Sequence, residues 1–132
     1  MKHEEFMIGD WFLNPKGEVV QCRKNLYSKP NKYWEYSNGI DLSYQFFKDN
    51  GFVGDREEMT KEDLDLTIKV RPWLNSQSAF LFSVEITDAN GILAHLIHVS
   101  TVHQFQQLLR ACGLVDIANE IQVNRIDLQP LN

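Results

Sequence analysis

The sequence is poor in cysteine and has no long hydrophobic run. Its two cysteines, Cys22 and Cys112, lie far apart and have no partner at metal-site spacing, so we expect buried, reduced thiols. No apolar run approaches the roughly 18 residues that a membrane span requires. Residues 1–5 are polar and acidic with no apolar stretch behind them, which predicts no export signal. We therefore expect a soluble, cytoplasmic protein without a membrane partner.

Motifs of common catalytic sites are also missing. The sequence has no Ser-His-Asp context, no glycine-rich phosphate loop and no cysteine–histidine pairing. Paired carboxylates occur at Glu57 with Glu58 and at Asp63 with Asp65, but acid–base chemistry needs a pocket that shifts their pKa values. We expect a protein that is not an enzyme and carries no cofactor.

Size and charge limit the architecture. The 132 residues are 43% hydrophobic, enough for one core and too few for two independent ones. We predict a single domain, 1–132, with subdomains 1–54 and 62–128. The net charge of −5 is uneven: residues 16–34 hold five basic residues and one acid, whereas residues 35–66 hold nine acids and three basic residues. A local basic face can still bind phosphates in an acidic chain.

The first third predicts short strands. Residues 6–13 and 18–24 are rich in apolar and β-branched residues, and Asn14-Pro15-Lys16-Gly17 between them has the composition of a hairpin turn. A third strand is predicted over Lys32–Tyr36, ended by Ser37-Asn38-Gly39. Short strands at this spacing are typical of a small Src-homology-3-like β-barrel.

A short helix should follow the barrel. Ser43 can cap its first turn, and Asn50-Gly51 supplies a left-handed stop. Three aromatic residues would anchor it to the barrel: Phe46, Phe47 and Phe52. Residues 53–61 resemble a charged, exposed connector that contains the subdomain boundary, and Thr60 with Asp63 fits one further helical turn.

The second half predicts an antiparallel β-meander. Apolar residues alternate with polar ones over residues 66–71 and 80–87, and Asp88-Ala89-Asn90-Gly91 forms a turn. Residues 92–99 are apolar at most positions, which predicts a central strand covered by a helix. The overall expectation is an α+β fold, in which this meander packs on a C-terminal helix and a final strand.

The C-terminal helix should begin at Ser100 or Thr101 and end at Gly113, because Thr101 and Gln104 fit a capping box. One face would hold the apolar residues Val102, Phe105, Leu108, Leu109 and Cys112, while Gln104, Gln107 and Arg110 would point outward. A last strand is predicted over Glu120–Ile126, followed by a frayed tail over residues 127–132.

Three segments resemble those of a family of short, uncharacterised proteins of Bacteroidetes genomes, prophages and mobile elements. They are Ile8-Gly9-Asp10-Trp11, residues 40–43 running to Asn50-Gly51-Phe52, and the helix Val102–Leu108. Family members carry a His-Gln-Leu-Gln-Asn-Leu helix, and this chain departs from it at Phe105, at Gln107 and over residues 109–113. The resemblance implies the barrel-plus-helix fold and a phage- or mobile-element background, but no activity.

Histidines suggest a metal site, since imidazole is a common zinc ligand. His95 and His98 are three residues apart in a predicted strand, so their side chains would point to opposite faces. We therefore predict no metal site. His103, in the first turn of the helix, could contact a neighbouring strand, line a groove or serve an enzyme's concave site, and we favour a structural role.

Two surfaces are candidates for binding. The first is the outer side of the C-terminal helix, where His103, Gln104, Gln107 and Arg110 could contact a protein partner, with the acidic connector as an alternative. The second holds cations and aromatics in the composition of a single-stranded nucleic-acid platform: Arg23, Lys24, Tyr27, Lys29, Lys32 and Tyr33. We favour a non-catalytic protein-interaction module, with a nucleic-acid-binding accessory protein as the alternative. Partner identity and oligomeric state do not follow from the sequence.

Overall fold

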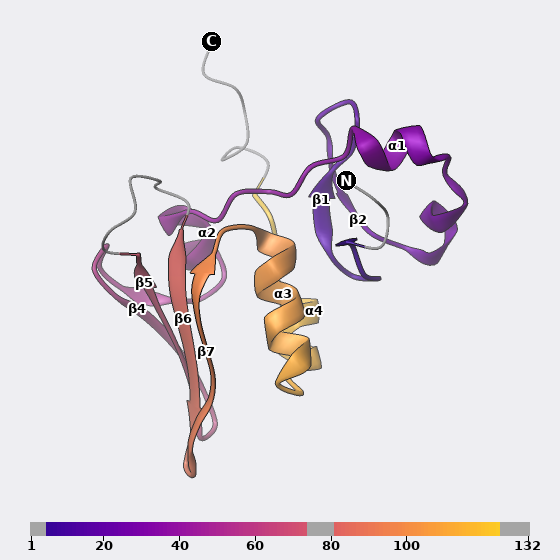
Figure 1. Ribbon diagram of the computed structural model, residues 1–132. Helices are drawn as coiled ribbons and strands as arrows, with labels where there is room; N and C mark the ends of the chain where they lie inside the picture. The colour runs from indigo at the N-terminus through magenta and orange to yellow at the C-terminus, as the bar shows by residue number, and fades with distance from the viewer. Residues whose placement is uncertain (1–4, 74–80, 125–132) are drawn as a thin grey trace. The chain divides into compact units, whose positions relative to one another are not determined.

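The computed structural model describes residues 5–73 and 81–124 (Figure 1). It confirms an α+β fold, and the chain divides into two compact units. Unit 1 combines residues 5–41 with residues 101–124, and unit 2 comprises residues 42–73 and 81–100. The C-terminal helix therefore belongs with the N-terminal hairpin, a grouping that differs from the expected subdomains 1–54 and 62–128.

The predicted N-terminal hairpin is confirmed. Strands β1 (Trp11–Leu13) and β2 (Val19–Gln21) pair antiparallel. Asn14 organises the turn, because its Oδ1 accepts the backbone N–H groups of Lys16 and Glu18 at 3.0 and 2.9 Å. Among the described residues of unit 1 these are the only two named strands, so the Src-homology-3-like barrel is not confirmed.

The predicted strand over residues 32–36 is wrong. A 3-10 helix, η2 (Lys24–Ser28), is followed by helix α1 (Asn31–Glu35). Pro30 precedes α1 with an extended backbone, and its fixed φ suits a helix start. Trp34 and the half-buried Tyr33 pack together on a core formed with Phe6, Phe12 and Cys22. Adjacent residues can share a core on a helix, whereas in a strand they face opposite sides.

Helices α3 (Val102–Ala111) and α4 (Val115–Glu120) complete unit 1. The start and end of α3 are confirmed: Thr101 N–H donates to Gln104 Oε1 at 3.3 Å, and Gly113 has a φ of 80°. The strand predicted over Glu120–Ile126 is wrong for the described residues, because α4 ends at Glu120 and residues 121–124 have no regular structure. Ile117, Ala118 and Ile121 are buried at helical spacing. Residues 127–132 lie outside the described part.

Unit 2 begins with helix α2 (Tyr44–Asp49), as predicted. Phe46 N–H donates to Ser43 Oγ at 3.0 Å, and Gly51 ends the helix with a φ of 87°. Phe47 packs edge-on against Phe52 and Phe82 at centroid distances of 5.2 and 5.1 Å. The expected anchoring of these aromatics on an N-terminal barrel is not confirmed; the ring contacts of Phe47 with Phe52 and Phe82 lie within unit 2.

One antiparallel sheet forms the rest of unit 2, in the order β3-β4-β5-β6-β7. Its strands are β3 (Val53–Gly54), β4 (Met59–Asp63), β5 (Leu66–Pro72), β6 (Phe82–Asp88) and β7 (Gly91–Val99). The meander is confirmed, and residues 53–57 are exposed as expected, but Met59–Asp63 form a strand, so the connector is wrong there and so is the helical turn at Thr60 and Asp63. Met59 pairs with Val70, both buried, and this non-local pairing holds the charged residues of β4 in the sheet.

Strand β7 lies at the edge of the described sheet, so the prediction of a central strand is wrong. Between the pairs Val84–Leu96 and Phe82–Val99, β7 has two residues, Ile97 and His98, where β6 has one, Ser83. A second irregularity lies between Ile86 and Thr87 of β6. A bulge changes the direction in which the following side chains point. The exposed apolar residues of β7 therefore do not alternate regularly between its two faces.

Candidate functional site

The expected partner-binding helix α3 meets the turn that precedes β1. Gly9 makes this turn with a φ of 96°, and its N–H donates to Cys22 O at 2.9 Å. The turn directs the next side chain, Asp10, into the interior of unit 1, where it is fully buried. A Cβ at Gly9 would lie 2.9 Å from the end of the Arg110 side chain, at Nη2, and the positive φ is the reason that glycine is favoured here.

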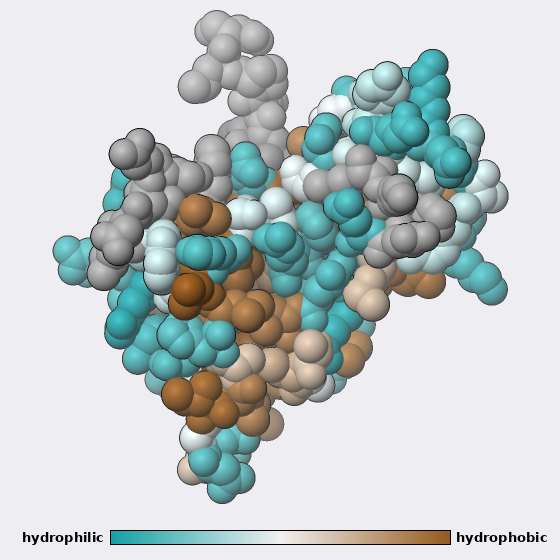
Figure 2. All heavy atoms as spheres, in the orientation of Figure 1, coloured by the Kyte–Doolittle hydropathy of each residue, from teal (hydrophilic) through white to brown (hydrophobic). Residues whose placement is uncertain are grey.

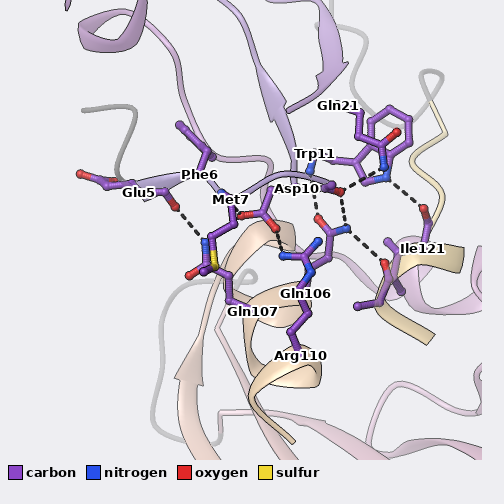
Figure 3. A network of polar contacts seen from close by, with 12 residues as sticks. Glu5, Phe6, Met7, Asp10, Trp11, Gln21, Gln106, Gln107, Arg110 and Ile121 are labelled. Carbon is purple, nitrogen blue, oxygen red and sulfur yellow. Dashed lines mark hydrogen bonds and ion pairs between the residues drawn. The ribbon is translucent and has the colours of Figure 1, made fainter. Parts of the chain in front are cut away.

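Helix α3 supplies two of the three groups that bind the Asp10 carboxylate (Figure 3). Arg110 Nη1 forms an ion pair with Oδ1, and Gln107 Nε2 donates to Oδ2 at 2.7 Å. Met7 N–H donates to the same Oδ2 at 2.8 Å. A buried carboxylate is tolerated only with such partners, because its desolvation is costly. The network thus ties α3 to the N-terminal turn.

Gln106 extends this network to β1 and α4. It is fully buried, its Oε1 accepts Trp11 N–H at 2.9 Å, and its Nε2 donates to the carbonyl oxygens of Gly9 and Ala118 at 2.9 and 3.3 Å. Trp11 Nε1 also donates to Ile121 O at 2.9 Å. The sequence offered one signal for this role, since Gln106 lies four residues after Val102 and three before Leu109, on the buried face.

Most of the predicted partner-binding residues are engaged inside unit 1. The expectation that Gln107 and Arg110 point outward is wrong, because both bind Asp10 and Gln107 also donates to Glu5 O at 2.9 Å. His103 is buried, and Gln104 is exposed while accepting the Thr101 N–H. These contacts give α3 a folding role.

His103 occupies a tight apolar position. Its ring lies 4.7 Å from the Phe6 ring, and a Cβ at Gly39 would lie 2.8 Å from its Cε1. Its Nδ1 is buried and has no hydrogen-bond partner among the described residues. Burial lowers the pKa of His103 below its ordinary 6.5, while the nearby charges of Asp10 and Glu5 oppose that shift. Burial therefore favours the neutral form of the His103 imidazole.

His95 and His98, the two histidines considered as metal ligands, contact different residues. His98 packs edge-on against Trp73 at 4.8 Å, and His95 pairs with Glu85 across the strands. Among residues 5–73 and 81–124, no three histidine, cysteine, aspartate or glutamate side chains gather in a group that could hold a metal ion. Cys22 and Cys112 are free thiols, and burial raises the pKa of both, which keeps them protonated at neutral pH.

Residues 23–36, the candidate nucleic-acid-binding segment, lie largely at the surface of unit 1. The structure places its four cations on or beside η2 and α1, all exposed: Arg23, Lys24, Lys29 and Lys32. Tyr27 and Tyr36 are also exposed, and Lys29 Nζ lies 5.4 Å from the Tyr33 ring centroid. Trp34 is buried and cannot stack on a ligand. Cations and tyrosines therefore share one exposed stretch of about fourteen residues.

A second surface was missed by the sequence analysis. Four aliphatic residues of β7 are between 41% and 64% exposed: Ile92, Leu93, Leu96 and Ile97. Gly91–Val99 contains no Lys, Arg, Asp or Glu. Figure 2 shows hydrophobic surface along the part of the sheet where Figure 1 labels β7. The apolar composition of residues 92–99 predicted a central strand covered by a helix, whereas β7 is an exposed strand at the edge of the described sheet.

Comparison with protein-family models, with curated proteins and with solved structures finds no match in any of the three. The resemblance to the Bacteroidetes family therefore stays a prediction. Within the described ranges, no helix is both long enough and apolar enough to cross a membrane.

Replacing Arg110 should strongly destabilise unit 1. The Arg110→Met variant leaves the buried Asp10 carboxylate without its cation, and we expect the free energy of unfolding to fall by about 3 to 5 kcal/mol in urea titrations. Adding Asp10→Asn should recover part of this loss, because no unpaired buried charge remains. Arg71→Met, which breaks the exposed pair with Glu58, is the control and should cost less than about 1 kcal/mol. Equal losses for Arg110→Met and Arg71→Met would contradict the role assigned to the network.

His103 should make stability depend on pH. Its pKa is lowered in the folded state, so the unfolded chain binds more protons just below the unfolded value of about 6.5. The contribution of His103 to stability is therefore complete above that pH and should decline as the pH falls below it. Urea unfolding of a His103→Gln variant should lose this dependence, while His95→Gln, at an exposed position, should keep it. An unchanged pH dependence in His103→Gln would refute the assignment.

Proposed function

We propose that this protein is a non-catalytic protein-interaction module whose binding surface is strand β7. The observation that carries the proposal is an uncharged edge strand of nine residues that exposes four aliphatic side chains. An edge strand offers free backbone N–H and C=O groups to an incoming strand, and its side chains supply specificity. The expectation of reduced thiols leads us to place the module in the cytoplasm, and the family resemblance suggests a phage- or mobile-element background.

Other surfaces fit a protein partner less well. The side chains of α3 that were candidates for binding are largely used by Asp10. In the acidic segment 53–61, Glu58 lies 2.5 Å from Arg71 Nη2 and 4.0 Å from Lys69 Nζ, so part of its charge is neutralised. The opposite edge, β3, has only two residues. Strand β7 remains the longest uncommitted surface among the described elements.

A non-catalytic role is consistent with how the buried polar groups are used. Arg110 binds Asp10, and Gln106 binds the backbone of Gly9 and Trp11. These side chains therefore hold structural elements together and do not converge on a substrate site. Catalytic groups need accessible positions within reach of a substrate. In the described residues these buried groups instead hold the N-terminal turn, α3 and α4 together.

The proposal is tested by comparing what wild-type and variant proteins capture from a nuclease-treated host lysate. Ile97→Lys adds a charge to β7, while Val53→Lys adds the same charge to β3, where Val53 is 69% exposed. We expect a discrete protein to be captured by wild type and by Val53→Lys and to be lost with Ile97→Lys. Circular dichroism checks that both variants fold. Capture that is indifferent to Ile97 but is lost with Val53→Lys would contradict the assignment to β7.

Nucleic-acid binding through the segment 23–36 is a second proposal, favoured by its exposed cations and tyrosines. Aromatic side chains can stack on bases while cations hold phosphates. Four cations predict that the logarithm of affinity for single-stranded DNA falls with the logarithm of salt with a slope of roughly −3.

Fluorescence anisotropy with a labelled single-stranded oligonucleotide tests this second proposal. Replacing Lys29 and Lys32 with Glu should weaken binding at least tenfold and flatten the salt slope. The matched control replaces Lys48 and Lys69 with Glu, which gives the same change in net charge in unit 2. If both double variants bind equally, a specific role of the segment is excluded.

A further inference from the structure

We infer that β7 pairs with the β7 of a second copy of this chain, antiparallel and about a two-fold axis. The inference rests on the proposed function, in which β7 is the binding surface, and it names the partner. Pairing would join the two five-stranded sheets along their β7 edges. Such an interface is isologous, so the same residues contribute from both copies.

The backbone of β7 is available for pairing over a defined length. One side of the strand pairs with β6 from Asp88–Gly91 to Phe82–Val99. On the other side, the described residues supply no strand partner. Just beyond the strand, Ser100 O accepts the Leu42 N–H at 2.9 Å, so the chain itself covers that position. The free edge is therefore limited to Gly91–Val99.

The lack of Lys, Arg, Asp and Glu in β7 favours pairing with a second copy of β7 over binding of a charged partner. When identical strands pair antiparallel, every side chain lies near residues of its own sequence, and like charges placed opposite each other would repel. Gly91–Val99 contains no Lys, Arg, Asp or Glu, and its only ionisable side chains are His95 and His98, so self-pairing places no permanent like charges opposite each other. In contrast, β4 carries Lys61, Glu62 and Asp63. A partner recognised through charge would find no complementary group on β7.

Apolar side chains lie on both faces of β7. Leu96 pairs with the buried Val84 and shares its face, whereas Ile92 pairs with the half-buried Thr87 on the other face. A partner must therefore present apolar residues above and below its own edge. A second copy of β7 meets that requirement, and each copy would cover the aliphatic side chains of the other on both faces.

The size of the contact predicts a weak dimer. Each copy contributes one strand of nine residues with four half-exposed aliphatic side chains, compared with about 20 to 30 residues a side in a standard stable interface. The bulges of β7 also interrupt a regular ladder. We therefore expect a reversible equilibrium, with dissociation in the micromolar range or weaker, and not an obligate dimer.

Sedimentation velocity of the purified full chain over about 1 μM to about 1 mM tests the inference. The expected result is a mass that rises with concentration from 15.4 kDa toward twice that value. Ile97→Lys should weaken dimerisation at least tenfold by placing added positive charges on both paired strands, while Val53→Lys should leave it unchanged. A wild-type chain that stays monomeric throughout would overturn the inference.

Hydrogen exchange of the wild-type protein provides a second readout that needs no variant. At high concentration the amides of residues 91–99 that point away from β6 should exchange more slowly than at low concentration. A doubled mass without this protection would place the dimer contact elsewhere and overturn the inference. Failure of the self-pairing inference can be distinguished from failure of the proposed function. A chain that stays monomeric but captures another protein through Ile97 would refute self-pairing and leave the interaction module in place.

Discussion

The buried carboxylate of Asp10 is the constraint on which unit 1 depends. It lies 97 residues from Gln107 and 100 residues from Arg110 in the sequence, yet these two side chains supply most of its hydrogen bonds and its counter-charge. Leaving such a carboxylate unpaired is strongly unfavourable. The need to satisfy it fixes both the rotation of α3 and the position of the turn at Gly9. It also explains why the polar face of α3 serves folding.

Features with a local cause could be predicted from the sequence. The Asn14 turn, the Ser43 cap and the Gly113 stop each depend on residues within a few positions, and all three are confirmed. The alternation over Leu66–Pro72 likewise identified its strand. In each case the interaction that determines the structure is formed by neighbours in the sequence, so its signal is complete within a short window.

Features with a non-local cause were missed. Met59 belongs to a strand because it pairs with Val70, and β7 is exposed because the sheet ends there; neither fact is visible in a short window. Gln106 was given no role by the sequence analysis, although it lies on the buried face and binds Gly9, Trp11 and Ala118. A polar residue at a buried helical position becomes informative only when a distant partner such as Trp11 is known.

The two units use their side chains differently, and this difference supports the assignment of function. In unit 1 the buried side chains of Asp10 and Gln106 are bound by groups of the same unit, and Phe6, Phe12 and Trp34 pack together in its core. In unit 2, packing within the sheet accounts for Ile68, Val84 and Ile86, which are buried. It does not account for the aliphatic residues of β7, because half-exposed side chains add little to the stability of a fold. Edge strands usually carry charges that prevent pairing. An edge that is both apolar and uncharged therefore calls for an explanation outside its own unit, and strand pairing with another chain provides one.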